Sequence, residues 1–261
     1  MYKLRRKLFS QNFLHSRKLI SRLIRSSSIG KNDLVLEIGP GKGTITELLL
    51  YQARYVLAVE IDSHWCSYLQ EKFNHVDTLT LYQDDILHFR LPTVPYKVFG
   101  NIPFSIEGKI IRKLIDAKNP PEDCYLVVMK ELACRLSAPY KENLFSLIHK
   151  PWFEFSISHR FQRTDFTPIP SVDAVIMRFA KRKEPLLPWR QRTQYQRFVA
   201  AGFGQGLPVV KNLQGVYGNS FTTRIFQKLH IDKRAKPGTL SLHQWISLYR
   251  SFVSPLSEST I

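Results

Sequence analysis

The sequence predicts an α/β protein with a doubly wound, Rossmann-like sheet and a small all-helical domain at its carboxyl end. Short apolar runs alternate with segments of helical spacing along most of the chain. Glycines end the first apolar run, as is typical of a central parallel strand. Beyond residue 188 the spacing turns helical. These patterns favour one α/β domain followed by a helical one.

Each predicted element follows from its own pattern. Five apolar runs are expected to be parallel strands: 33–39, 55–62, 79–87, 96–104 and 124–129. The segments between or after them have helical spacing: 43–53, 63–73, 105–115 and 130–136. Residues 152–161 alternate with period 2 and residues 172–181 follow a proline-rich turn, so we expect two antiparallel strands that close the sheet. Helices are then expected at 189–203, 222–231 and 240–252.

The first 32 residues form a basic arm with nine Lys or Arg residues and no acid. Such an Arg-rich and Ser-rich segment is also typical of a mitochondrial transit peptide. Four apolar residues nevertheless form one helical face that would cover a sheet, and Ser16 precedes them as a possible cap: Leu19, Ile20, Leu23 and Ile24. We therefore expect a structural arm.

The net charge of +17 is concentrated at the two ends of the chain. Residues 181–252 hold thirteen basic residues against only Glu184 and Asp232. A surface that merely aids solubility is one interpretation, but such asymmetry favours a polyanionic partner, because neutralised phosphates release counterions. We predict a catalytic domain at 1–183 and a small basic RNA-binding domain at 184–261 that ends in a frayed tail.

Composition excludes several classes of protein. No apolar run approaches the roughly 20 residues that cross a membrane, so we expect a soluble protein with no membrane partner. Cys66, Cys124 and Cys134 form no CxxC pair, and neither a disulfide framework nor a metal site is expected. A cytoplasmic location fits this cysteine usage best.

A glycine-rich loop follows the first predicted strand, with Gly39, Gly41 and Gly43 at alternate positions. Glycines let the backbone approach a ligand closely. The loop is not a dinucleotide fingerprint, because Thr44 stands where Gly or Ala is needed, and it is not a P-loop. By itself it indicates either a binding loop or a tight turn.

Acidic residues end the next two strands. Glu60 is placed to accept hydrogen bonds from ribose hydroxyls, Asp85 to accept one from an adenine amine, and Ile86 to pack on the ring. The ends of parallel strands meet at one edge of a sheet, so the three loops suit a nucleoside. No pyrophosphate-binding signature accompanies them, which favours S-adenosylmethionine over NAD.

The fourth strand ends in "GNIPF". The lone pair of an exocyclic adenine amine is delocalised, so methyl transfer to it needs two acceptors that hold its hydrogens. The Asn101 side chain and the Ile102 carbonyl supply two acceptors, and Pro103 restricts the backbone between them and Phe104. The Phe104 ring is placed to stack on an extruded base. We predict that these four residues form the catalytic loop.

At this point the sequence resembles the ribosomal RNA adenine-N6 dimethyltransferases. The motifs "SQNFL", "EIGPGKGTIT", "VEID", "DDIL", "GNIPF" and "DFTPIPSV" occur in that family's order. The "IIRKL" and "FQRTDFTPIP" segments and the terminal helices look like the Erm branch. That resemblance implies methylation of one adenosine in the peptidyl-transferase loop of 23S ribosomal RNA, and resistance to macrolide, lincosamide and streptogramin B antibiotics.

The resemblance also implies site residues. Gln11, Asn12 and Leu14 are expected to line the S-adenosylmethionine pocket. Phe166 is expected to sandwich the target adenine against Phe104; the alternative is that its ring only packs beneath the proline-rich turn that follows it. The remaining cofactor-binding residues are expected at Gly39, Gly41, Gly43, Glu60, Ile61, Asp85, Ile86 and Asn101. The expected substrate is protein-free 23S RNA or a precursor particle, and the expected state is a monomer.

The chain departs from the family pattern after Phe104. At the position of Phe104 itself the family often has Tyr. Ser105, Glu107 and Gly108 stand where Asn and a Ser-Thr pair are common. An acid here would repel RNA phosphates unless it turns away from them. Two alternatives stay open: a KsgA-like enzyme that dimethylates adjacent adenosines of 16S RNA, and a non-catalytic RNA-binding protein or mitochondrial transcription-factor relative.

Overall fold

The computed structural model describes residues 12–137 and 141–257, which divide into two compact units. The first unit comprises Met1–Ala133 and Phe155–Lys181, and the second comprises Cys134–Glu154 and Arg182–Ile261. The chain therefore enters the second unit twice, first through a short segment that the sequence pattern did not assign to it. A functional division at residue 183 stays a prediction.

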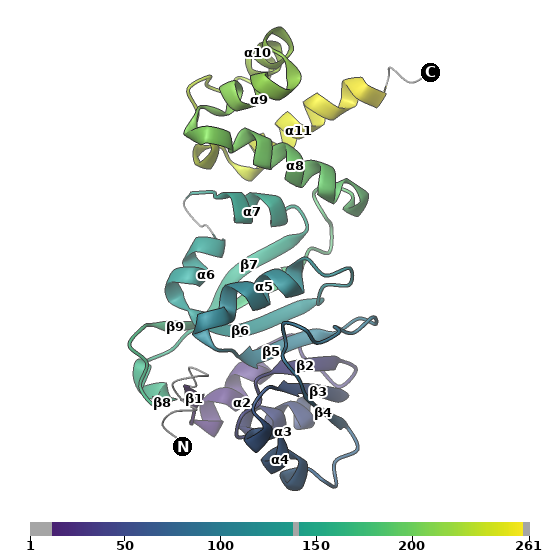
Figure 1. Cartoon of the computed structure of the whole chain (residues 1–261), viewed down its shortest axis with the longest axis vertical. Helices are drawn as coiled ribbons and strands as arrows, with labels where there is room; N and C mark the ends of the chain where they lie inside the picture. The colour runs from purple at the N-terminus through teal and green to yellow at the C-terminus, as the bar shows by residue number, and fades with distance from the viewer. Residues whose placement is uncertain (1–11, 138–140, 258–261) are drawn as a thin grey trace. The chain divides into compact units, whose positions relative to one another are not determined.

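A seven-stranded sheet forms the centre of the first unit, in the order β4-β3-β2-β5-β6-β9-β7 (Figure 1). Strands β2 to β6 pair in parallel, and β9 pairs antiparallel with β6. The bounds are β4 Leu79–Gln83, β3 Tyr55–Glu60, β2 Leu34–Ile38, β5 Lys97–Asn101, β6 Asp123–Met129, β9 Ala174–Lys181 and β7 Phe153–Arg160. The predicted doubly wound α/β class is confirmed.

Four of the predicted parallel strands end earlier than expected, β2 by one residue, β3 by two and the next two by more. Strand β4 ends at Gln83 and β5 at Asn101, whereas the apolar runs continue to residues 87 and 104. Pro103 has no N–H for a sheet hydrogen bond, and a 3-10 turn follows at Phe104–Ile106. The residues beyond Asn101 are therefore released from the sheet and can form a loop at its edge.

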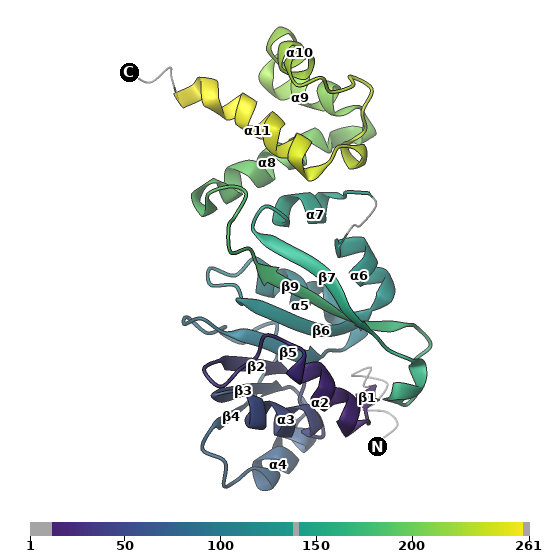
Figure 2. The ribbon, with the colours of Figure 1, turned by 180° about the vertical axis from the view of Figure 1, so that it is seen from behind.

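Helices cover both faces of this sheet. The views from opposite sides show α5 in front in Figure 1 and α2 in front in Figure 2. Ser16 caps α2, as expected, by accepting a hydrogen bond from the Leu19 N–H at 3.3 Å. The bounds are α2 Arg17–Arg25, α3 Thr44–Gln52, α4 Ser63–Lys72 and α5 Glu107–Ile115. The next helix, α6 Lys130–Ser137, follows β6 and crosses the division between the two units after Ala133.

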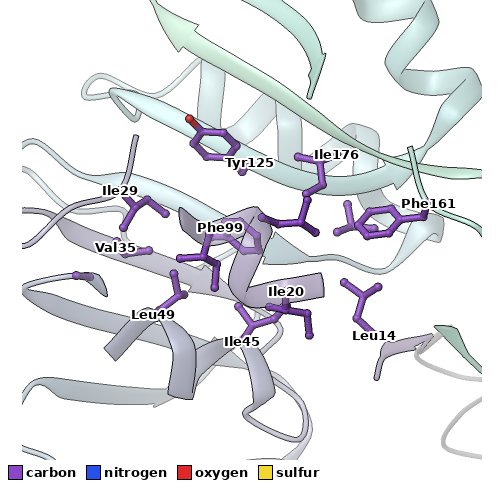
Figure 3. Close-up of a cluster of buried hydrophobic side chains, with 14 of the residues drawn as sticks. Leu14, Ile20, Ile29, Val35, Ile45, Leu49, Phe99, Tyr125, Phe161 and Ile176 are labelled. Atoms are coloured by element: carbon purple, nitrogen blue, oxygen red, sulfur yellow. The ribbon is translucent and has the colours of Figure 1, made fainter. Parts of the chain in front are cut away.

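One hydrophobic cluster joins α2 and α3 to the sheet (Figure 3). Side chains alternate along each strand, so every second residue of β2, β5, β6 and β9 faces these helices. The labelled members are Leu14, Ile20, Ile29, Val35, Ile45, Leu49, Phe99, Tyr125, Phe161 and Ile176. The N-terminal helix thus belongs to the core.

A separate two-stranded ribbon holds the arm against a distant loop. Strand β1, Phe13–Leu14, pairs antiparallel with β8, Phe166–Thr167. The register places Leu14 opposite Phe166. No apolar period reveals this pairing, because each strand has only two residues.

The second unit is helical around an aromatic core. Its helices are α7 Leu144–His149, α8 Arg192–Gly202, α9 Val209–Tyr217, α10 Asn219–Lys228 and α11 Leu242–Ser257. Tyr195, Phe198 and Trp245 are buried there, whereas Trp189 is 42% exposed. Most aromatics of this segment therefore serve packing. Within the described parts of the chain, no helix is long and apolar enough to cross a bilayer.

Gly43 allows α4 to pack against the start of α3. Its φ is +74°, and a Cβ there would lie 2.6 Å from Leu69 Cδ2 and 2.9 Å from Phe73 Cε2. We predict that Gly43→Ala lowers the free energy of unfolding by about 1–3 kcal/mol, from backbone strain and the clash. Urea unfolding checks this, with Gly215→Ala in α9 as the control, because nothing lies within 4 Å of its Cβ position. Equal stability of the two variants would contradict the packing role.

Candidate active site

A pocket opens at the edge of the sheet where the carboxyl ends of β2, β3, β4 and β5 meet. Five loops or segments that are far apart in the sequence contribute to its walls. The lining residues are Asn12, Phe13, Ile38, Gly39, Gly41, Val59, Glu60, Ile61, Asp84, Asp85, Ile86, Asn101, Ile102, Pro103, Phe104 and Ile106. The predicted convergence of four strand ends is therefore present in the structure.

The glycine loop forms one wall without side chains. Gly39 and Gly41 have φ values of +69° and +51°, which side-chain-bearing residues rarely adopt. A Cβ at Gly41 would lie 2.7 Å from the Phe13 ring, so the arm packs directly on this loop. The ring also makes an edge contact with Trp65 at 5.7 Å. Gly43 does not line the pocket. It lies against Leu69 and Phe73 instead.

Glu60 connects the glycine loop to the end of β3. Its Oε2 accepts a hydrogen bond from the Gly41 N–H at 3.0 Å, and its Oε1 accepts one from the Asp62 N–H at 2.9 Å. The residue is only 3% exposed, and this burial raises the pKa of its carboxyl group. Each carboxylate oxygen keeps a further lone pair that is able to accept a hydrogen bond from a ribose hydroxyl. That interaction stays a prediction.

The next wall combines a carboxylate with apolar side chains. Asp85 Oδ1 accepts a hydrogen bond from the Leu87 N–H at 2.8 Å, and Oδ2 lies 3.4 Å from His88 Nδ1. Ile86 is buried, whereas Ile61 exposes 49% of its surface although it lines the pocket. An exposed isoleucine at a pocket rim offers an apolar surface for a planar ring.

Asn101 is oriented by the arm. Its Nδ2 donates a hydrogen bond of 2.7 Å to the backbone carbonyl of Asn12. A carbonyl only accepts, so the amide group must turn its nitrogen toward Asn12 and its oxygen away. The Asn101 oxygen is thus left as an acceptor in a pocket that Ile102, Pro103 and Phe104 also line.

Besides Gly43, two predicted residues that the structure describes, Leu14 and Phe166, do not line the pocket. Leu14 is buried in the core cluster, and Gln11 lies outside the described residues. Phe166 is 1% exposed and packs against Phe161 at 5.1 Å. Its burial follows from the β1–β8 pairing and agrees with the packing alternative. Stacking by Phe166 stays a prediction, and it requires the ring to leave the cluster.

Five lining residues were missed in the sequence: Phe13, Ile38, Val59, Asp84 and Ile106. Phe13 lies inside the "SQNFL" motif and Asp84 adjoins Asp85, so position in a motif could have indicated both. The other three are apolar residues close to strand or turn ends. Their composition does not distinguish them from core residues.

Glu37 is a buried acid of β2, immediately before the glycine loop. Neither of its oxygens has a hydrogen-bond partner among the described residues, and the neighbouring Thr46 hydroxyl also lacks one. Burial, with a smaller contribution from the Glu60 charge, raises the pKa of Glu37 to about 8. At neutral pH this carboxyl group therefore keeps its proton. No grouping of metal-ligand side chains is found in the described ranges.

Comparisons with known proteins agree with this arrangement. The sequence model of a family described as "Ribosomal RNA adenine dimethylase" matches residues 2–253. "Ribosomal RNA small subunit methyltransferase A" of Lactococcus lactis is 30% identical over 263 residues, which cover 93% of this chain and 88% of that protein. "rRNA adenine N-6-methyltransferase" of Bacillus anthracis is 28% identical over 246 residues, covering 92% and 85%. The crystal structure of "23S rRNA methyltransferase ErmE" has a TM-score of 0.82 and 28% identity, covering 93% of this chain and all of that one.

We predict that Glu37 makes stability fall as pH rises. The folded state keeps the proton up to about pH 8, whereas the unfolded chain releases it near the ordinary value of 4.5. The stabilisation is thus complete at low pH and is lost between these values, by on the order of 2–4 kcal/mol. Glu37→Gln has no proton to lose and removes this loss. The free energy of unfolding of the variant, relative to that of wild type, should therefore increase between pH 5 and pH 8.

Urea unfolding at a series of pH values checks this prediction. Glu71→Gln, on the exposed side of α4, is the control and should follow wild type. Parallel pH curves for wild type and Glu37→Gln would contradict the raised pKa.

Proposed function

The chain belongs to the ribosomal RNA adenine dimethylase family, and we propose that it methylates one adenosine of 23S ribosomal RNA, in the peptidyl-transferase loop. The activity common to the family is S-adenosylmethionine-dependent N6-methylation of adenine in ribosomal RNA, and this chain is such an enzyme. The choice of RNA, the target position and the role of each residue are the proposal.

The observation that carries the 23S proposal is the likeness to the ErmE structure. It extends over all of that chain, so the helical unit is included as well as the sheet, and the sequence identity is 28%. The "GNIPF" loop, the "IIRKL" helix and the terminal helical segment support the same branch. Methylation at that position would give resistance to macrolide, lincosamide and streptogramin B antibiotics.

A small-subunit RNA substrate is the second candidate. The 30% identity with ribosomal RNA small subunit methyltransferase A of Lactococcus lactis favours it. An enzyme of that kind would modify adjacent adenosines in 16S RNA. The two candidates share the pocket and the chemistry, and they differ in which RNA is brought to it.

The walls of the pocket fit S-adenosylmethionine. Gly39 and Gly41 leave one side free of Cβ atoms, and Glu60 and Asp85 place carboxylates at the ends of successive strands. Ile61 offers the exposed apolar surface that would cover the adenine ring. When bound, the cofactor supplies an electrophilic methyl group on a sulfonium centre.

The catalytic loop would act by holding the target amine. We propose that the Asn101 Oδ1 and the Ile102 carbonyl accept its two hydrogens and so direct the nitrogen lone pair at the methyl group. The hydrogen bond from Nδ2 to the Asn12 carbonyl supports this role, because it turns the oxygen away from the arm. Phe104 would stack on the extruded base.

Basic side chains would hold the RNA by its phosphates, and its shape would guide the choice of site. The helical unit presents many of them at its surface, which supports an RNA-binding domain at 184–261. The exposed members are Lys183, Arg190, Arg197, Lys211, Arg224, Lys228, Lys233, Arg234, Lys236 and Arg250. Trp189 adds an exposed ring, with the Arg192 guanidinium 4.8 Å from its centroid. A monomeric enzyme acting on protein-free RNA or a precursor particle completes the proposal.

Transfer of labelled methyl from S-adenosylmethionine to protein-free 23S and 16S RNA tests the proposal, with primer extension to map the modified base. We expect one stop, in the peptidyl-transferase loop of 23S RNA. A stop at paired adenosines of 16S RNA would select the second candidate. Transfer to neither RNA would contradict both.

We predict that Asn101→Asp loses about 100-fold in methyl transfer at pH 8, because a carboxylate cannot donate to the Asn12 carbonyl 2.7 Å away. Protonation of the introduced carboxyl restores a donor, so the activity relative to wild type should rise as pH falls toward 6. RNA binding should be retained.

Single-turnover rates across this pH range, together with filter binding of RNA, provide the measurement. Asn119→Asp is a matched control, since Asn119 Nδ2 also donates to backbone carbonyls, of Pro92 and Val94, away from the pocket lining. Wild-type activity of Asn101→Asp at pH 8 would contradict the proposed orientation.

A further inference from the structure

Glu107, the acid that departs from the family pattern, is turned into the protein. It is 4% exposed, and its Oε2 accepts a hydrogen bond of 2.9 Å from the Met129 N–H. Glu107 is the first residue of α5, and Met129 is the last residue of β6. The carboxylate therefore connects the end of the catalytic loop to the neighbouring strand. Its charge is not presented to RNA at the surface.

The Met129 N–H points to the side of β6 on which β5 lies. Lys130 donates its N–H to the Asp173 carbonyl, just before β9, at 2.8 Å. Successive N–H groups of a strand point to opposite sides, so the Met129 N–H faces the β5 side. There it would meet the backbone that continues from Asn101.

The strand register identifies the backbone atom that would otherwise accept this hydrogen. Asn101 is paired with Val127 in the parallel ladder of β5 and β6. In such a ladder an N–H bonds to the carbonyl of the residue that precedes its partner. Two residues further along, the Met129 N–H would take the carbonyl of Ile102. Because β5 ends at Asn101, Glu107 accepts this hydrogen bond instead.

We propose that Glu107 is a positioning residue that keeps the Ile102 carbonyl free to accept a hydrogen from the target amine. The inference rests on the proposed role of that carbonyl in methyl transfer. Without the carboxylate, the part-buried Met129 N–H would be left without a protein partner, and the nearest acceptor in register is the Ile102 carbonyl. The loop would then be drawn toward the sheet and one of its two acceptors would be consumed.

Kinetic measurements on Glu107 variants test this role. We expect Glu107→Ala to lower kcat about 10- to 100-fold while the Kd for S-adenosylmethionine changes less than about twofold. Glu107→Gln keeps an acceptor oxygen at the same reach and should retain most of the wild-type kcat. Gly108→Ala is the control, because this exposed helical glycine has no atom within 4 Å of its Cβ position.

A second measurement does not depend on the RNA substrate. The chain has three methionines, Met1, Met129 and Met177, so selective ¹⁵N-methionine labelling gives a simple amide spectrum. The amide proton of Met129 should move upfield in Glu107→Ala and stay near its wild-type position in Glu107→Gln. Assignment uses Met177→Leu.

The outcomes separate this inference from the proposed function. Unchanged kcat in Glu107→Ala, an unmoved Met129 amide, or equal losses in the Ala and Gln variants would each overturn the role of Glu107. If Glu107→Ala does not fold, Glu107→Asp replaces it, since its shorter side chain withdraws the acceptor and should give the same loss of kcat. Absence of methyl transfer by wild type would overturn the proposed function instead. The amide shift would then still test the hydrogen bond from the Met129 N–H to Glu107.

Discussion

The site depends on one backbone event, the departure of β5 from the sheet at Asn101 while β6 continues to Met129. A strand that leaves its neighbour exposes polar groups on both, and each group needs a partner. On one side the released residues form the loop that lines the pocket. On the other side the Met129 N–H donates its hydrogen bond to the Glu107 carboxylate rather than to a backbone carbonyl. The loop is thereby held away from the ladder that its register would continue.

The same loop is fixed at its beginning by the N-terminal arm. Asn101 donates to the Asn12 carbonyl, and Phe13 packs on the bare Gly41 backbone. Pairing of β1 with β8 holds the arm in this place. Two very short strands therefore have a large effect, since they decide which atom of the Asn101 amide faces the pocket.

Electrostatics divide the chain into two environments. The pocket at the sheet edge is lined by the acids Asp84 and Asp85, whereas Glu37 does not line it and keeps its proton at neutral pH. The helical unit has a different surface, with basic residues such as Lys211 and Arg234 exposed around an aromatic core. The roles proposed for the two regions agree with these charges, because a cationic cofactor favours acidic side chains and RNA phosphates favour basic ones.

The sequence by itself determined the alternating architecture and the residues at the strand ends, Gly39, Glu60, Asp85 and Asn101. These follow from local patterns, since apolar period and chain order already assign each loop to one edge of a parallel sheet. The tertiary structure decided where side chains turn. Pairing between residues more than 150 positions apart buries Phe166, and Glu107 turns inward to accept a hydrogen bond from the Met129 N–H. Neither contact leaves a signal in the local sequence. Each depends on a backbone group that belongs to another strand and comes near only when the chain has folded.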